Sequence, residues 1–299
     1  MHIQCCGMRR REWPILLVLW TAGLLSIAVS FAIIWILITQ SIPFFQEVSV
    51  VEFLTGTRWT PLFTNKAFGV LPLLTGTLLT TFVALAVAVP MGVTIAIYLS
   101  EFASARFREV VKPVLEVLAS IPTVVYGYFA LVVVTPFLQR FIPDLSSFNA
   151  LSAGLVMGLM IMPMVSSLSE DALYALPYAL REAAYGLGAN RLQTVFRVLL
   201  PTAFPGILVA VILAMSRAIG ETMIVTIAAG MRPILTFDIR EPIQTITAYV
   251  VQVSMGDVPH DSLEHRTIYA VALLLFAVAF LLNLISYRIR RYYVRKFGM

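Results

Sequence analysis

The fold is decided by Glu182-Ala183-Ala184, followed by Gly188 and then by Val198-Leu199-Leu200-Pro201. The pattern is E-A-A-x3-G-x9-V-x-L-P, and it lies in a polar segment, 170–201, between two apolar segments of membrane-spanning length. Residues 179–185 are rich in good helix formers and are predicted to form a short helix. Gly188 allows a sharp turn, because glycine tolerates positive φ. The stretch therefore predicts a short helix and a turn that could move together as one rigid body on a partner.

The composition excludes an ordinary soluble domain. The chain is 60% hydrophobic and 12% charged, whereas soluble domains carry about 25% charged residues. The apolar residues gather in uncharged runs of roughly 20, the length that crosses a hydrocarbon core of about 30 Å. We predict an all-α integral membrane protein with six transmembrane helices, at residues 15–38, 72–98, 114–137, 150–168, 204–229 and 267–287.

The lysines and arginines predict how the chain is oriented. Fourteen of the 21 lie on the side that holds both termini and segment 170–201, six lie on the other side, and Arg217 lies inside a span. The positive-inside rule then predicts that both termini and segment 170–201 are cytoplasmic. The net charge of +5 is explained by this orientation, so it does not indicate a nucleic-acid partner.

Arg217 and Glu221 are charged residues inside the predicted fifth span, with Ser216 and Thr222 beside them. Charges at this depth are costly and usually face the bundle interior or a water-filled path. Their spacing of four predicts a shared helical face. Two interpretations stay open: the pair locks helix packing, or Arg217 offers its planar donors to an oxyanion on a translocation path and Glu221 orients it.

A proline interrupts the predicted third span at Pro122, beside Thr123 and Tyr126. Proline in a span frees backbone carbonyls that must be satisfied inside the bundle. A packing kink and a kink that lines a path are equally compatible with this pattern. Glu116, near the cytoplasmic start of the same span, is predicted to be interfacial rather than functional.

Several kinds of site are not expected. The chain has no G-x-x-x-x-G-K-[ST], so it cannot hold a nucleotide by the P-loop mechanism, and no nucleophile–base or metalloprotease motif supports an enzyme. No cofactor or metal is expected. The acidic outer loop 230–266 includes His260, Asp261 and His265, and a docking surface for an extracytoplasmic protein is favoured there over a metal site.

From about Trp59 to the C-terminus, the sequence resembles the permease subunits of bacterial high-affinity phosphate ABC importers, and specifically their PstC type rather than PstA. The E-A-A stretch resembles the loop of ABC importer permeases that docks on the ATPase. The further stretches that carry the resemblance are 68–77, 96–101, Lys112-Pro113-Val114-Leu115-Glu116, 120–127 and Ser216-Arg217-Ala218-Ile219-Gly220-Glu221-Thr222-Met223.

The resemblance implies a type I importer permease (MetI-like) fold in the bacterial inner membrane. The implied partners are a PstA-like permease, two copies of a PstB-like cytoplasmic ATPase, a PstS-like phosphate-binding protein outside, phosphate and membrane lipid. Residues 1–66 would form a cytoplasmic tail, first span and outer loop, and 67–299 the transmembrane domain. The implied coupling residues are Glu182, Ala183, Ala184, Gly188, Leu200 and Pro201, and the implied pathway residues are Arg217, Glu221, Ser216, Thr222, Thr123 and Tyr126. A permease for another oxyanion, such as sulfate or molybdate, would share this fold.

Overall fold

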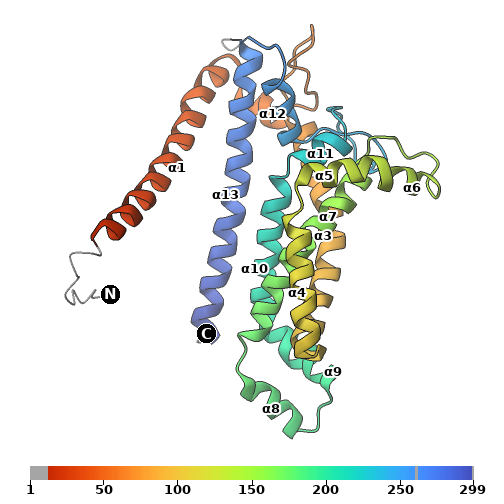
Figure 1. Cartoon of the computed structure of the whole chain (residues 1–299). Helices are drawn as coiled ribbons and strands as arrows, with labels where there is room; N and C mark the ends of the chain where they lie inside the picture. The colour runs from red at the N-terminus through yellow and green to blue at the C-terminus, as the bar shows by residue number, and fades with distance from the viewer. Residues whose placement is uncertain (1–12, 260–261, 298–299) are drawn as a thin grey trace.

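The structure, a computed structural model, describes residues 13–259 and 262–297. Over these residues its regular secondary structure is helical, apart from one isolated bridge between Trp59 and Phe68. The predicted tail residues 1–12 and the loop residues His260 and Asp261 lie outside this description. Five described helices are long and apolar enough to cross a membrane, and a bent helix pair raises the number to six. The all-α membrane class predicted from the sequence is therefore confirmed. The helices, shown in Figure 1, are α1 (Trp13–Glu47), α2 (Val50–Thr55), α3 (Leu71–Ile97), α4 (Ala105–Ser120), α5 (Thr123–Phe129), α6 (Thr135–Gln139), α7 (Ala150–Tyr174), α8 (Tyr178–Gly186), α9 (Arg191–Thr194), α10 (Leu200–Ile219), α11 (Met223–Ala228), α12 (Ile246–Ser254) and α13 (Leu263–Phe297).

The centre of the bundle is the close packing of α3 against α7. A Cβ atom added to Gly154 would lie 2.6 Å from Cβ of Val83, and one added to Gly158 would lie 2.8 Å from the carbonyl oxygen of Ala84. Small residues at such positions let helix backbones approach closely where no water drives association. The two helices consequently form one tightly packed unit.

The predicted third span is broken. α4 and the segment from α5 to α6 form the bent pair, with an angle of 86° between them, so residues 114–137 are not one straight helix. Ile121 is extended (φ −61°, ψ 129°), as expected for a residue that precedes proline. The buried Tyr126 hydroxyl donates to the carbonyl oxygen of Leu118 at 2.8 Å, which joins the two sides of the break.

The fifth span also differs from its predicted limits of 204–229. α10 ends at Ile219 and Gly220 is its C-terminal cap, so α11 is a separate short helix. At its other end, α10 continues back through a π-helical turn, Val195–Leu199, into α9, so the apolar segment begins at Arg191. Proline is tolerated in the first turn of a helix, because the N–H that it lacks would have no partner there. Pro201 lies in the first turn of α10, directly after the π-helical turn.

An aromatic cluster closes the end of the bundle opposite α8. Trp59 packs against Tyr249 with ring centroids 5.0 Å apart, and Phe44 packs edge-on against Phe53 and Phe68. These rings are buried, and they join the end of α1 to α2 and α12. The segment before α3 is therefore packed onto the rest of the chain at this end.

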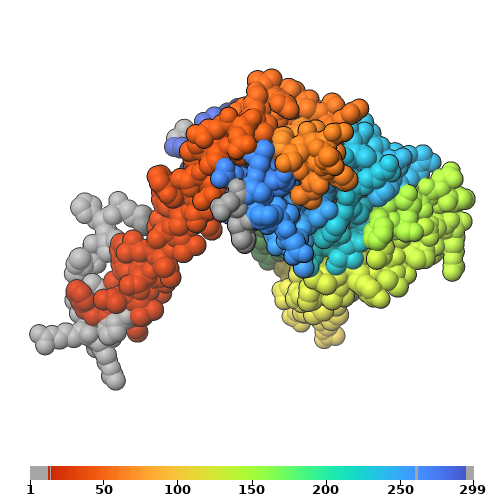
Figure 2. Space-filling model, turned by 90° about the horizontal axis from the view of Figure 1, so that it is seen from above, coloured from red at the N-terminus to blue at the C-terminus, as the bar shows by residue number. Residues whose placement is uncertain are grey.

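Helix α1 projects away from the bundle. It packs with α13 at the upper end in Figure 1, and Figure 2 shows it extending alone from the body of the molecule. Its side chains along most of its length are exposed, including Trp20, Phe31 and Trp35. In Figure 1 the end of α13 lies in the lower half of the molecule, which also holds α8.

Candidate functional site

Arg217 lies in a groove between α4, α7 and α10. The groove has a volume of about 290 Å3. Its lining residues are Lys112, Leu115, Glu116, Ala119, Met160, Pro163, Met164, Ser167, Glu170 and Arg217. The structure thus brings Arg217 together with the Lys112–Glu116 stretch, from a different helix.

The Arg217 guanidinium has little to bind within the chain. Its Nη2 atom lies 3.5 Å from the sulfur of Met160, and a thioether is a weak acceptor. Among the residues that the structure describes, no carboxylate lies within ion-pair distance of it. Most of its five N–H donors are therefore available to a ligand in the groove.

The predicted pairing of Arg217 with Glu221 on one helical face is wrong, because α10 ends between them. The Glu221 carboxylate instead accepts hydrogen bonds from the backbone N–H groups of Met223 (3.0 Å) and Ile224 (3.3 Å). These groups begin α11 and have no partner within the helix. The Thr247 hydroxyl donates to the Glu221 carbonyl at 2.7 Å. Glu221 therefore joins α10, α11 and α12 at the helix break.

The other four predicted pathway residues do not line the groove that holds Arg217. Ser216 donates to the carbonyl of Ile212 at 3.0 Å and Thr222 to that of Gly220 at 3.3 Å. Tyr126 is buried at the break between α4 and α5, and Thr123 is a half-buried first residue of α5. Their place on a pathway stays a prediction.

Two groove residues were not predicted to be functional from the sequence, Lys112 and Glu170, and a third, Glu116, was expected to be interfacial. Glu170 is buried, with its Oε1 3.1 Å from Nζ of Lys112 and 3.7 Å from Nε of Arg108. A lone carboxylate at the end of an apolar run was the available signal for Glu170. The pairing itself depends on how α4 packs on α7.

The E-A-A segment has the predicted local structure. Residues 179–185 lie within α8, and Gly188 has a φ of 81°. Ala184 is buried, whereas Glu182 and Ala183 are exposed, as are the large side chains of Tyr178, Tyr185 and Leu187. Leu200 and Pro201 begin α10, and Pro201 is exposed. α8 lies at the lower end of the molecule in Figure 1, and most of its side chains are exposed.

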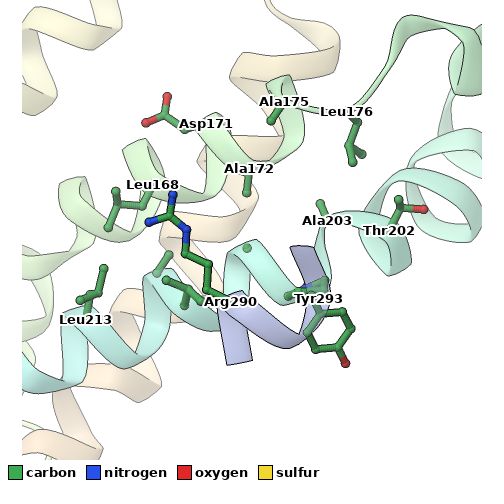
Figure 3. Close-up of a pocket in the computed structure, with 14 residues that line it drawn as sticks. Leu168, Asp171, Ala172, Ala175, Leu176, Thr202, Ala203, Leu213, Arg290 and Tyr293 are labelled. Atoms are coloured by element: carbon green, nitrogen blue, oxygen red, sulfur yellow. The ribbon is translucent and has the colours of Figure 1, made fainter. Parts of the chain in front are cut away.

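A larger cavity, of about 400 Å3, lies between α7, α10 and α13. Figure 3 shows small apolar side chains around it, with Arg290 extending from α13 toward Leu168 and Asp171 of α7. It contains no residue of the predicted site, and its lining is mostly apolar. We therefore place the candidate anion site in the smaller groove, where charged groups converge.

Comparison with known proteins gives consistent matches. Residues 88–298 match the model of the family described as binding-protein-dependent transport system inner membrane component. A probable ABC transporter permease, YqgH of Bacillus subtilis, is 36% identical over 88% of this chain and 85% of its own length. The phosphate transport system permease protein PstC of Mesorhizobium japonicum is 33% identical over 79% of this chain and 76% of its own length.

Solved structures confirm the type I importer permease fold. A chain of a bacterial alginate ABC transporter, in complex with its alginate-loaded periplasmic protein, aligns over 93% of both chains with a TM-score of 0.59 and 21% identity. A chain of the inward-facing MetNI methionine transporter aligns over 75% of this chain with a TM-score of 0.55 and 22% identity. The chain belongs to the family of binding-protein-dependent transport system inner membrane components and, within that family, is a permease of the PstC type.

Proposed function

We propose that the chain is a permease subunit of an ATP-driven inorganic phosphate importer and forms one half of the translocation pathway. The observation that carries the proposal is the groove in which Arg217 lies without a carboxylate partner among the described residues. The similarity to PstC permeases supports phosphate as the anion. A guanidinium suits phosphate because its donors can bind two oxygens at once.

The groove also contains a second cation and two carboxylates. Lys112 offers a further positive charge, while Glu116 and Glu170 limit the net charge of the groove. A transport site must bind its anion well enough to admit it and weakly enough to release it. We infer that Arg217 supplies the attraction and that the carboxylates keep binding weak. A PstA-like permease would complete the pathway from the other side.

The energy for transport would come from a separate cytoplasmic ATPase, because the sequence has no P-loop motif. Two PstB-like subunits would act on this chain and its partner permease. On this chain, the contact would be the exposed face of α8, with Glu182 and the cap residue Leu187. α8 and both termini would then lie in the cytoplasm. The boundary between residues 1–66 and the transmembrane domain at 67–299 stays part of the proposal.

The opposite end of the bundle would receive the phosphate-binding protein. α12 and the loop between α11 and α12 lie at that end, away from α8 (Figure 1). The exposed apolar side chains of α1 would face membrane lipid or the partner permease.

The test is labelled-phosphate uptake in cells that lack their own high-affinity importer. The complete transporter is supplied with wild-type chain or with Glu182→Lys, and sulfate and molybdate uptake are measured in parallel. We expect phosphate-selective uptake that Glu182→Lys abolishes at unchanged membrane levels. Uptake of sulfate or molybdate in place of phosphate would refute the proposed substrate, and uptake unaffected by Glu182→Lys would refute the coupling role.

A further inference from the structure

We propose that Arg181 and Glu101 are positioning residues that pass the movement of α8 to α3 and, through it, to the groove that holds Arg217. The inference rests on the proposed function, because it concerns how movement of an ATPase reaches the pathway. It assigns a role to two residues that neither the E-A-A pattern nor the groove includes.

The two side chains form a close, largely buried ion pair. Nη2 of Arg181 lies 2.7 Å from Oε1 of Glu101, and Nε of Arg181 lies 3.3 Å from each carboxylate oxygen. The side chains are only 11% and 9% exposed. Such a two-oxygen pairing fixes orientation as well as distance. It joins α8 to the π-helical turn Tyr98–Phe102 at the end of α3.

The same guanidinium also binds the end of α7. Nη1 donates to the carbonyl of Leu176 and Nη2 to that of Leu173, each at 3.2 Å. The last carbonyls of a helix have no partner within it, so they bind an arginine readily. Arg181 therefore holds three elements together: α8, the end of α7 and the end of α3.

Arg181 and its neighbour Glu182 face different surroundings. Glu182 is exposed on the outer face of α8, whereas Arg181 is directed into the molecule. A partner that presses on the outer face would move α8 as a unit. Arg181 then carries that displacement to Glu101, because three hydrogen-bond contacts hold the two side chains together.

Glu101 lies in the π-helical turn at the end of α3, and α3 itself is packed closely on α7. A π-helical turn is an irregularity within a helix that is often found at functional sites. Arg108 of α4 holds this turn through its Nε, 3.1 Å from the carbonyl of Leu99. Beyond it, α3 is packed so closely on α7 that a Cβ added to Gly92 would lie 2.8 Å from Cβ of Val165. Displacement of α3 therefore moves α7, which contributes Met160 and Glu170 to the groove.

The test uses the complete transporter purified and reconstituted in proteoliposomes with the binding protein. The variants are Arg181→Gln, Glu101→Gln and the double variant. They are compared with Arg181→Lys, which keeps the ion pair but loses the two-oxygen pairing of the guanidinium. Arg106→Gln is the matched control, since Arg106 is an exposed arginine on the same side of the bundle. The measured quantity is phosphate transported per ATP hydrolysed, per assembled complex.

We expect Arg181→Gln and Glu101→Gln each to lower this ratio by about tenfold, within the range usual for coupling between sites. The double variant should be no worse than either single one, Arg181→Lys should be intermediate, and Arg106→Gln should match wild type. A merely structural pair would lower the yield of complex or its melting temperature but leave the ratio unchanged, and that result would overturn the proposal. Absence of phosphate uptake by the wild-type complex would instead refute the proposed function, so the two failures are distinguishable.

Discussion

Nζ of Lys112 lies 3.1 Å from Oε1 of Glu170, in the same groove that holds Arg217. Glu170 is buried, while Lys112 is half exposed, so the carboxylate depends on Lys112 more than Lys112 depends on it. The groove consequently holds one cation that a carboxylate neutralises and one, Arg217, that no described carboxylate does. This difference separates the roles of the two residues.

Replacing Lys112 by Met should lower phosphate uptake by about tenfold. This is the effect of losing one charge-assisted hydrogen bond from Lys112 to phosphate. It should also destabilise the chain, because Arg108, at 3.7 Å, is then the one ion-pair partner that Glu170 keeps among the described residues. Lys112→Arg should retain most uptake. Labelled-phosphate uptake and melting of the detergent-solubilised complex measure both effects. Wild-type uptake by Lys112→Met would show that Lys112 takes no part in the pathway.

Glu221→Gln and Glu221→Ala distinguish a helix cap from a pathway charge. Glutamine keeps an oxygen that can accept from Met223 and Ile224, so we expect Glu221→Gln to retain stability and most uptake. Alanine removes the cap and should cost about 1 kcal/mol. Melting temperature and uptake are measured on both variants. If Glu221→Gln is as inactive as Glu221→Ala at normal stability, the negative charge itself is needed and capping is not the main role.

Gly154→Ala tests the contact between α3 and α7. The new methyl group would lie 2.6 Å from Cβ of Val83, so the helices must separate, and overpacking of this kind costs about 1–3 kcal/mol. Gly23→Ala in α1 is the matched control, since its Cβ would meet nothing within 4 Å. We expect a clear fall in melting temperature for Gly154→Ala alone. Equal melting of the two variants would contradict the close packing.

The outer loop predicts a pH effect at Asp238. Arg240 donates to both oxygens of Asp238, and this hydrogen bonding lowers the pKa of Asp238 from 3.8 to about 2. A carboxyl whose pKa is lower in the folded state stabilises the fold when the pH is above its unfolded-state pKa of 3.8. That contribution is lost as the pH falls through 3.8 toward the folded-state pKa of about 2. Transport near neutral pH should therefore be unaffected.

The difference in melting temperature between wild type and Asp238→Asn should shrink as the pH falls from about 5 to about 2. The pair lies at the surface, so the difference should be small at every pH. A difference that grows on acidification would contradict the direction of the pKa shift.

The sequence was informative where the signal is local. Apolar runs located the membrane segments, and the helix formers and Gly188 predicted α8 and its turn, because propensity and backbone freedom are properties of the residues themselves. The same local logic misplaced Glu221. A spacing of four implies one face only if the helix continues, and here Gly220 ends it.

The groove could not be predicted from such signals. Lys112, Glu170 and Arg217 come from three helices, and only their packing brings them together. The partnership of Arg181 with Glu101 likewise joins residues 80 positions apart. Pro122 predicted a kink, but the size of the bend, 86°, could not be predicted. The bend is stabilised by the hydrogen bond from Tyr126 to Leu118, which forms only in the folded chain.

The central claim is that Arg217 binds the transported anion. The most direct measurement is the initial rate of labelled-phosphate uptake by the complete transporter with Arg217→Gln and Arg217→Lys, at matched membrane levels. Because hydrogen bonds to a charged group contribute about 1.5–3 kcal/mol each, Arg217→Gln should lower uptake by about a hundredfold, and Arg217→Lys should retain a measurable part. Wild-type uptake by Arg217→Gln would show that the guanidinium is not on the phosphate path.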